Sequence, residues 1–364
     1  MITPDLLVAP EAPKGFMAWL EQPHVKWAVP LPLLLALAPL IWLFFRSTWK
    51  ELDREAVAYR ERLREAGSEV DYRPLIALGL GAVILTLQEY YGGSNQAFYQ
   101  TVIVENLRKY EATHPGGMVN FPRYEELYRL IFWAVTRIGG YLAPLVLWRA
   151  VFWKDSILDF GLRTKGFLEH AWIYAMFVAI MIPVMITVAK QPDFGTYYPF
   201  YKQASRSWLD FGMWEVFYIG QFFALEIFFR GWWVRACRGF GAGAILCMVV
   251  PYCMIHYGKP YLEACGAIVA GTVLGSLSMK TRSIYAGFLV HITVAILMDF
   301  LALHHRHALP ERISPTSTGT FVFKYTVHTL WIVWALALTM LLVAFVRRWP
   351  QIRAQLARKR AAAE

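Results

Sequence analysis

Long runs of apolar residues, separated by shorter polar connections, follow one another along most of the chain. A helix needs about 20 mostly apolar residues to cross a lipid bilayer. Nine segments are candidates for such spans: 29–46, 74–90, 128–150, 168–190, 212–233, 242–258, 261–279, 284–303 and 321–346. This pattern predicts an all-α fold, a polytopic membrane helix bundle with about nine transmembrane helices.

Three polar stretches stand out between the apolar segments. Residues 47–70 combine helical spacing with many Glu and Arg neighbours, which predicts a solvated helix at the cytoplasmic face. Residues 91–127 form a long connection with paired glycines and scattered aromatic residues, and residues 191–211 form a second connection rich in Tyr. Both connections are expected to be loops on the outer side of the membrane.

Composition and charge support the membrane interpretation. Hydrophobic residues make up 57% of the chain and charged residues 17%, whereas about 25% of residues are charged in an ordinary globular protein. The first, third, fifth and seventh connections and the tail carry about twice as many Lys and Arg residues as the others. The positive-inside rule then places the N-terminus outside and the C-terminus in the cytoplasm. The net charge of +10 therefore needs no nucleic-acid partner, and the bilayer itself is the expected partner.

The stretch "FFALEIFFRGWW" (222–233) places two ionisable side chains, Glu226 and Arg230, among apolar and aromatic residues. Their spacing of four puts them on one helix face. Ionisable groups inside a membrane are costly and usually face the bundle interior in pairs. Two further segments carry His256 and His291. Taken one at a time, each of these residues is equally well explained as a buried structural group.

The depths of these residues favour a single site. If the helices on either side of 239–241 form a hairpin, Glu226 and His256 each lie about 20 Å from the turn, at 1.5 Å per residue. His291 lies roughly 14 Å along its own helix, and Arg230 is about 6 Å nearer the turn than Glu226. The four side chains can then converge in the outer half of the membrane.

A carboxylate and two imidazoles make a plausible hydrolytic set. A buried carboxylate can act first as general base and then as general acid. One His can share the attacking water, and a second can donate a hydrogen bond to the developing oxyanion. In this interpretation Arg230 holds the Glu226 carboxylate in its charged form.

The motifs around these residues resemble the CPBP family, the CAAX prenyl proteases and bacteriocin-processing (Abi) enzymes. The family pattern of Glu-Glu-x-x-x-Arg, Phe-x-x-x-His and His-x-x-x-Asn/Asp is similar to "LEIFFRG" (225–231), "YCMIH" (252–256) and "HITVA" (291–295). "SILDFGLR" (156–163) resembles the segment that precedes the family's core, and the resemblance covers about residues 155–304.

The resemblance implies an intramembrane glutamic endopeptidase that needs no metal or cofactor. It implies that Glu226 and His256 activate water, that His291 helps to form the oxyanion hole, and that Arg230 positions Glu226. Residues 155–304 would be the protease core. Residues 1–154 would form an added transmembrane section in front of it, and residues 305–364 a last transmembrane helix with a basic tail.

Three positions depart from the family pattern, and the mildest is Tyr252 in place of Phe. Leu225 stands where the family has the first Glu of its pair, and Ala295 stands where it has Asn or Asp. Asp299 lies eight residues beyond His291 and is rotated by about 80° from it, so it is a poor replacement. Either Glu226 carries the reaction alone among the acids, or hydrolysis is lost.

Three alternatives stay open. Two His and one Glu also match a catalytic zinc set, although the chain has no His-Glu-x-x-His pattern. A catalytically altered member of the family could act as a bacteriocin-immunity or membrane scaffold protein. A transporter could use the same residues as a proton relay. The favoured function is cleavage of a membrane-anchored or exported protein or peptide, in a bacterial cell membrane.

Overall fold

The computed structural model describes residues 15, 18–19, 22–92, 97–115, 120–152, 154–164, 171–190, 194–259, 261–316 and 326–361. Every regular element within these ranges is a helix. The α-helices are α2 (Pro23–Ala28), α3 (Pro30–Glu65), α4 (Arg73–Leu87), α5 (Glu105–Thr113), α6 (Phe121–Val151), α7 (Ala171–Val188), α8 (Phe194–Tyr197), α9 (Trp208–Glu226), α10 (Val234–Ala236), α11 (Gly243–Met254), α12 (Tyr261–Thr281), α13 (Tyr285–His305) and α14 (Thr326–Ala361). Short π-helices and 3₁₀-helices connect several of them: η2 (Gln88–Gly92), η3 (Tyr99–Val104), η4 (Ile157–Asp159), η6 (Lys202–Arg206), η7 (Ile227–Trp233) and η8 (Arg238–Phe240).

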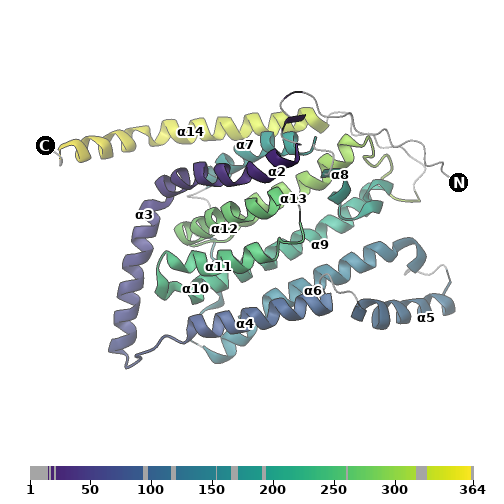
Figure 1. Ribbon diagram of the computed structural model, residues 1–364, viewed down its shortest axis with the longest axis horizontal. Coiled ribbons are helices and arrows are strands. Elements are labelled where there is room, and N and C mark those ends of the chain that lie inside the picture. The colour runs from purple at the N-terminus through teal and green to yellow at the C-terminus, as the bar shows by residue number, and fades with distance from the viewer. Residues whose placement is uncertain are drawn as a thin grey trace.

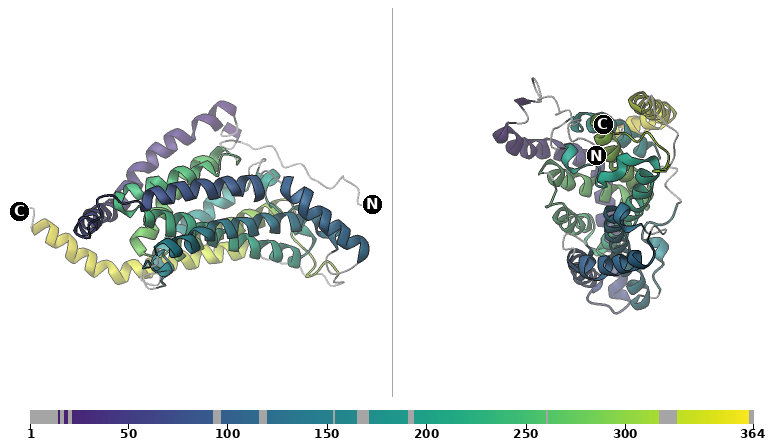
Figure 2. Two further views of the ribbon diagram at one scale, coloured as in Figure 1. Left: turned by 90° about the horizontal axis from the view of Figure 1, so that it is seen from below. Right: turned by 90° about the vertical axis from the view of Figure 1, so that its right-hand side faces the viewer.

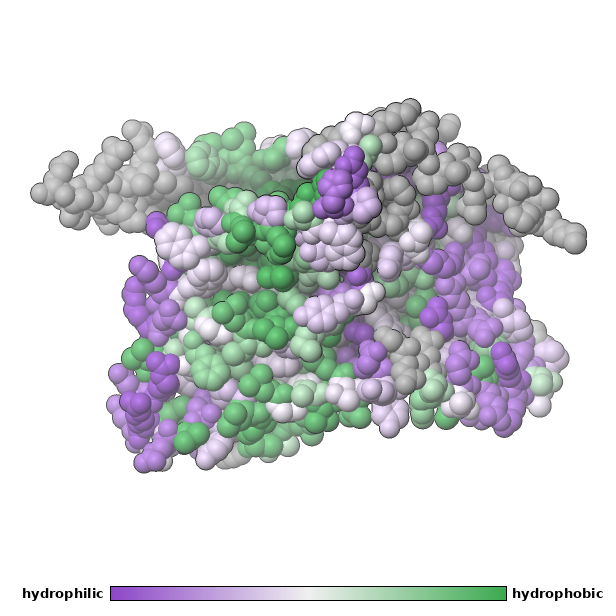
Figure 3. All heavy atoms as spheres, in the orientation of Figure 1, coloured by the Kyte–Doolittle hydropathy of each residue, from purple (hydrophilic) through white to green (hydrophobic). Residues whose placement is uncertain are grey.

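Most of the helices run along one axis of the molecule (Figure 1), and the right-hand view of Figure 2 looks down this axis. Hydrophobic residues cover the middle of the face shown in Figure 3, and hydrophilic residues gather at its two ends. This distribution is expected for a bundle that crosses a bilayer, because an apolar belt must face the lipid tails. The prediction of an all-α membrane bundle is therefore confirmed.

Six of the nine predicted spans correspond to helices in the described ranges that meet the length and apolarity of a membrane span. Each predicted segment overlaps a helix, but six helices in the described ranges are long and apolar enough to cross a membrane. They are Pro23–Glu65, Arg73–Gly92, Phe121–Val151, Glu263–Thr281, Tyr285–His305 and Leu330–Arg347. Trp172–Val188 and Gly243–Met254 are apolar but shorter. The remaining predicted segment, 212–233, corresponds to α9 and η7, which carry Glu226 and Arg230. A count of nine is not confirmed.

The charged stretch predicted as a surface helix is the second half of α3, continuous with the apolar segment before it. Pro39 lies within α3, and an internal proline bends a helix because it removes a backbone hydrogen bond. The later part of α3 crosses the ends of α12, α11 and α10 (Figure 1). Asp53 Oδ1 there accepts a hydrogen bond of 2.8 Å from the backbone N–H of Ala242.

We call one end of the bundle, formed by residues 47–73, 152, 154–163, 235–242 and 280–284, the basic end. Ion pairs and hydrogen bonds connect its four segments. Arg60 donates to the Gly239 carbonyl, Arg282 pairs with Glu55, and Arg73 pairs with Asp155 at 3.7 Å. The four segments are the first, third, fifth and seventh connections, which belong to the set with the larger share of Lys and Arg residues. They lie together at one end of the bundle.

The connection predicted as a loop at 91–127 is largely helical in the part that the structure describes. It contains η3 and α5, and α6 begins within it at Phe121. Tyr99, Val104 and Phe121 are buried against one another. The aromatic residues that looked scattered in the sequence form a small apolar cluster, which gives these short helices a packed face.

Candidate functional site

The candidate site begins at the junction of α9 and η7. Glu226 is the last residue of α9, and Arg230 lies inside the π-helical segment η7. π-Helical turns are rare and occur frequently at functional sites. The aromatic residues of η7 lie in the centre of the largest apolar cluster: Phe228 and Trp232 are completely buried. The surrounding packing therefore holds this irregular turn and both of its charged residues in place.

The Glu226 carboxylate is completely buried, and its two oxygens differ in their surroundings. Oε1 lies 2.9 Å from His291 Nδ1 and 3.1 Å from Arg230 Nη1. Oε2 is buried and has no hydrogen-bond partner among the described residues. A Cβ placed on Gly287 would lie 3.2 Å from Oε2, so the missing side chain of this glycine leaves room beside it. Oε1 thus has two neighbouring donors, and Oε2 has no hydrogen-bond partner among the described residues.

Arg230 is held from two sides besides its carboxylate partner. Its guanidinium lies over the ring of Tyr252, 3.9 Å from the centroid, which is a favourable position for a buried cation. Its backbone carbonyl accepts a hydrogen bond of 3.3 Å from the Ser278 hydroxyl. Tyr252 belongs to α11 and Ser278 to α12. The position of Arg230 therefore depends on two neighbouring helices.

His256 follows the end of α11 and is 9% exposed. Its Nδ1 lies 2.7 Å from the carbonyl oxygen of Tyr252. A carbonyl can only accept a hydrogen bond, so Nδ1 carries the proton and Nε2 is left as an acceptor. In the described part of the chain, no hydrogen bond links His256 to Glu226. The structure brings Glu226, Arg230 and His291 into direct contact, and His256 joins them through Tyr252.

His291 lies on α13 with its ring 4.2 Å from the ring of Phe222, measured between centroids. Its side chain is 15% exposed, whereas that of Glu226 is fully covered. Because an ionised carboxylate can only accept, His291 donates from Nδ1 to Glu226. Of Glu226, Arg230 and His291, the His291 imidazole is thus the side chain that solvent can reach.

The departures at Leu225 and Ala295 lie in apolar surroundings. Leu225 is 4% exposed and belongs to the cluster around Phe228. Ala295 is 3% exposed and packs in the cluster that contains Tyr218 and Phe222. Both side chains therefore lie among apolar neighbours. Glu226 is the carboxylate that contacts His291 and Arg230.

Asp299, considered as a replacement, belongs to a separate group on the same two helices. It is completely buried, and its Oδ2 accepts a hydrogen bond of 2.8 Å from Trp214 Nε1. Glu215, also buried, is the residue after Trp214 on α9. The sequence places Glu215 eleven residues, or about three turns, from Glu226. The burial of both carboxyl groups was not evident from the sequence, because it arises from the packing of α9 on α13.

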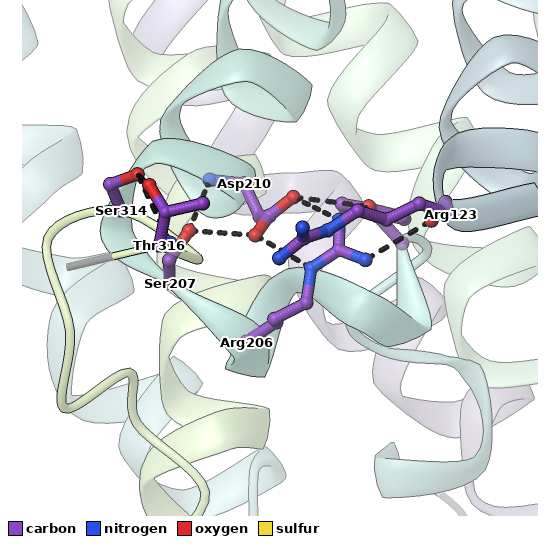
Figure 4. Close-up of polar contacts among 7 residues, drawn as sticks. Arg123, Arg206, Ser207, Asp210, Ser314 and Thr316 are labelled. Carbon is purple, nitrogen blue, oxygen red and sulfur yellow. Dashed lines mark hydrogen bonds and ion pairs between the residues drawn. The ribbon is translucent and has the colours of Figure 1, made fainter. Parts of the chain in front are cut away.

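A polar network fixes the beginning of α9, at the end of the bundle opposite the basic end (Figure 4). Ser207 caps the helix: its hydroxyl accepts a hydrogen bond of 3.1 Å from the Asp210 N–H and donates one of 2.6 Å to Asp210 Oδ2. Arg206 pairs with Asp210 and donates to the Arg123 carbonyl of α6 at 3.0 Å. Helix α9 is thereby attached to α6, which fixes the helix that carries Glu226.

Among the residues that the structure describes, no three His, Cys, Asp or Glu side chains come together as a group that could hold a metal ion. The three-ligand arrangement that the zinc alternative requires therefore has no counterpart in this part of the chain.

The fold and the site define a multi-pass membrane protein with a buried carboxylate held between a guanidinium and an imidazole. Residues 207–297 match the family model described as type II CAAX prenyl endopeptidase Rce1-like. All four candidate residues lie within the match, which supports a membrane peptidase. The resemblance to CAAX proteases predicted from the motifs is thus confirmed over these residues. No curated protein and no solved structure gives a significant match.

Proposed function

We propose that the protein is an intramembrane endopeptidase in which Glu226 is the general base. The observation that carries the proposal is the unequal environment of the two carboxylate oxygens. His291 and Arg230 hold Oε1 at 2.9 and 3.1 Å, while Oε2 is buried without a hydrogen-bond partner. A general base needs a fixed orientation and one oxygen within reach of a water, and this carboxylate combines the two.

The reaction follows from these contacts. Oε2 of Glu226 removes a proton from a water, and the water oxygen forms a bond to the scissile carbonyl carbon. His256 Nε2, left as an acceptor by the bond from Nδ1 to Tyr252, accepts the second water O–H and orients it. The tetrahedral intermediate then collapses, the C–N bond breaks, and the proton on Oε2 passes to the leaving amine.

In this mechanism His291 stabilises the negative charge of the intermediate. Its Nδ1 donates to Glu226, so its Nε2 donates to the oxyanion only after the ring has taken up a second proton from solvent, which returns to solvent when the products leave. Arg230 does not touch the substrate in this arrangement. It is a positioning residue that orients the Glu226 carboxylate through the ion pair of 3.1 Å. Hydrolysis by these residues requires no metal ion.

The substrate that fits this site is a membrane-anchored polypeptide. The Glu226 side chain is completely buried within the bundle, so a substrate segment must enter between the helices instead of binding at the surface. With the basic end on the cytoplasmic side, the site lies toward the outer half of a bacterial cell membrane. That position suits an exported protein cleaved near its exit from the bilayer.

The test compares membrane proteomes of cells that carry the wild-type protein, Glu226→Gln or Glu215→Gln. Glu215→Gln is the matched control, because it also changes a buried carboxylate on α9. We expect truncated C-terminal peptides of exported, membrane-anchored proteins to disappear with Glu226→Gln and to persist with the control. Unchanged termini in cells where the Glu226→Gln protein accumulates normally would rule out the hydrolase.

The second candidate function is a catalytically altered family member that acts as an immunity or scaffold protein. Leu225 and Ala295, both enclosed in apolar clusters, favour it because they remove polar groups that the family uses. The same strain set separates the two functions. If Glu226→Gln restores whatever phenotype deletion of the gene causes, then the protein acts without hydrolysis.

A further inference from the structure

Two adjoining cavities lie at the basic end of the bundle, between the second half of α3, the η7–η8 segment and the end of α12. Their volumes are about 380 Å³ and 500 Å³. Both are lined by Glu55, Arg235, Met279 and Arg282, so we treat them as one cleft and call it the basic cleft.

Arginine side chains dominate the lining of the basic cleft: Arg62, Arg163, Arg230, Arg235, Arg238 and Arg282. Its acidic side chains are Glu55 and Asp159, and each already pairs with an arginine. Glu55 pairs with Arg282, and Asp159 pairs with Arg163 at 2.8 Å. The cleft therefore has a positive charge that its own carboxylates do not neutralise.

Arg62, which is exposed, and the two partly buried residues Arg235 and Arg238 are the cations left over. No carboxylate of the described residues lies within ion-pair distance of Arg235 or Arg238, and the Nε atom of each is buried without a hydrogen-bond partner. Arg238 lies over the ring of Tyr59, 4.3 Å from its centroid, which fixes its direction. Burial and the neighbouring guanidinium groups of Arg238 and Arg282 lower the pKa of Arg235. An anion in the cleft would relieve this repulsion.

The backbone at Arg282 gives a second, independent indication. Arg282 has φ +56°, in the left-handed region where a non-glycine residue is strained. The N–H of Ser283 bonds to the carbonyl of Ser278 at 3.2 Å, which makes this the C-terminal turn of α12 that usually has glycine in that position. An arginine kept there against its conformational preference places a guanidinium in both cavities. Such strain is found at binding sites.

We infer that the basic cleft binds a phosphate group, as carried by anionic phospholipid headgroups and by soluble phosphates. Planar guanidinium groups donate paired hydrogen bonds that match phosphate oxygens. Basic pockets between helix ends on the cytoplasmic side bind anionic headgroups. The cleft lies at the level of the helix ends, where headgroups of a surrounding bilayer lie, so the lipid is the favoured source.

Native mass spectrometry of the full-length protein tests this inference, with phosphatidylglycerol and phosphatidylcholine as probes. We expect selective retention of phosphatidylglycerol, and about a tenfold or greater loss of it in the Arg235→Gln/Arg238→Gln variant, because charge-assisted hydrogen bonds are the strong ones. Arg54→Gln is the matched control. Arg54 is an exposed residue of α3 outside the cleft, and its removal deletes a charge at the same end.

Arg282→Gly separates binding from folding. Glycine suits the left-handed turn, so we expect this variant to have an unchanged or higher melting temperature and weaker phosphatidylglycerol retention. Inorganic phosphate and pyrophosphate form the second arm, read as a thermal shift in detergent. A shift that the double variant abolishes, without lipid selectivity, assigns the cleft to a soluble phosphate. Equal retention of both lipids with no phosphate shift, or an effect equal to that of Arg54→Gln, overturns the inference.

Discussion

The buried ion pair between Glu226 and Arg230 can be tested independently of any substrate. Both side chains are completely covered, and Nη1 lies 3.1 Å from Oε1. The perturbation is a double-mutant cycle of Glu226→Gln, Arg230→Met and the two together. Each single change leaves one charge buried without its partner. The double change removes both charges and leaves side chains of similar length in the same space.

The expected magnitudes follow from the burial and the separation. At 3.1 Å and an effective dielectric constant of about 20, two unit charges attract by roughly 5 kcal/mol. Stranding one member of a buried pair costs about 3–5 kcal/mol. Glu226→Gln strands Arg230, which keeps the Tyr252 ring as its neighbour. Arg230→Met leaves Glu226 with the hydrogen bond from His291. We expect each single variant to lose about 3 kcal/mol and the double variant to lose less than the sum by about 2 kcal/mol or more.

The assay is reversible unfolding of the purified protein in mixed detergent micelles, followed by circular dichroism. The coupling energy is the double-variant loss of unfolding free energy minus the sum of the two single losses. Additive losses would show that the two charges do not depend on each other, and they would remove the argument that Arg230 positions Glu226. An Arg230→Met variant with an unchanged unfolding free energy would also remove that argument.

Two further variants separate the chemistry of the site from the stability of its helix. Gly287→Ala places a methyl group 3.2 Å from Glu226 Oε2, so we expect proteolysis to fall by roughly ten- to a hundredfold, with the helical fold retained because alanine favours a helix. Unaltered cleavage would mean that Oε2 is not the reacting atom. Ser207→Ala removes the cap that accepts from the Asp210 N–H and should cost about 1 kcal/mol of unfolding free energy, with turnover per folded molecule unchanged.

The apolar pattern predicted the position of most helices because a run of some 20 apolar residues has few alternatives in a chain that enters a membrane. It could not predict the helices η3 and α5, since their stability comes from the packing of Tyr99 and Val104 on α6. It also could not predict that α3 continues through its charged half. Tertiary contacts decide both outcomes: packing on α6 for η3 and α5, and contacts at the basic end for the second half of α3.

In the candidate site, too, the sequence predicted some features, and tertiary packing determined others. A spacing of four residues was enough to predict that Glu226 and Arg230 share a face, and the depth argument placed His291 at their level. The contact of 2.9 Å between His291 and Glu226 agrees with that geometry. The π-helical turn at η7 and the bond from His256 to the Tyr252 carbonyl have no sequence signal. The part that His256 plays in the reaction stays a prediction.

In a site with one acidic residue, the same carboxylate must both hold its orientation and transfer the proton, whereas two acidic residues could share these tasks. Leu225 and Ala295 leave Glu226 as the carboxylate in contact with His291 and Arg230. The fold distinguishes its two oxygens by their neighbours: Oε1 contacts two donors, and Oε2 faces the space left by Gly287. Orientation and proton transfer can then be carried by one side chain. The glycine is consequently as much a condition of the proposed reaction as the histidines are.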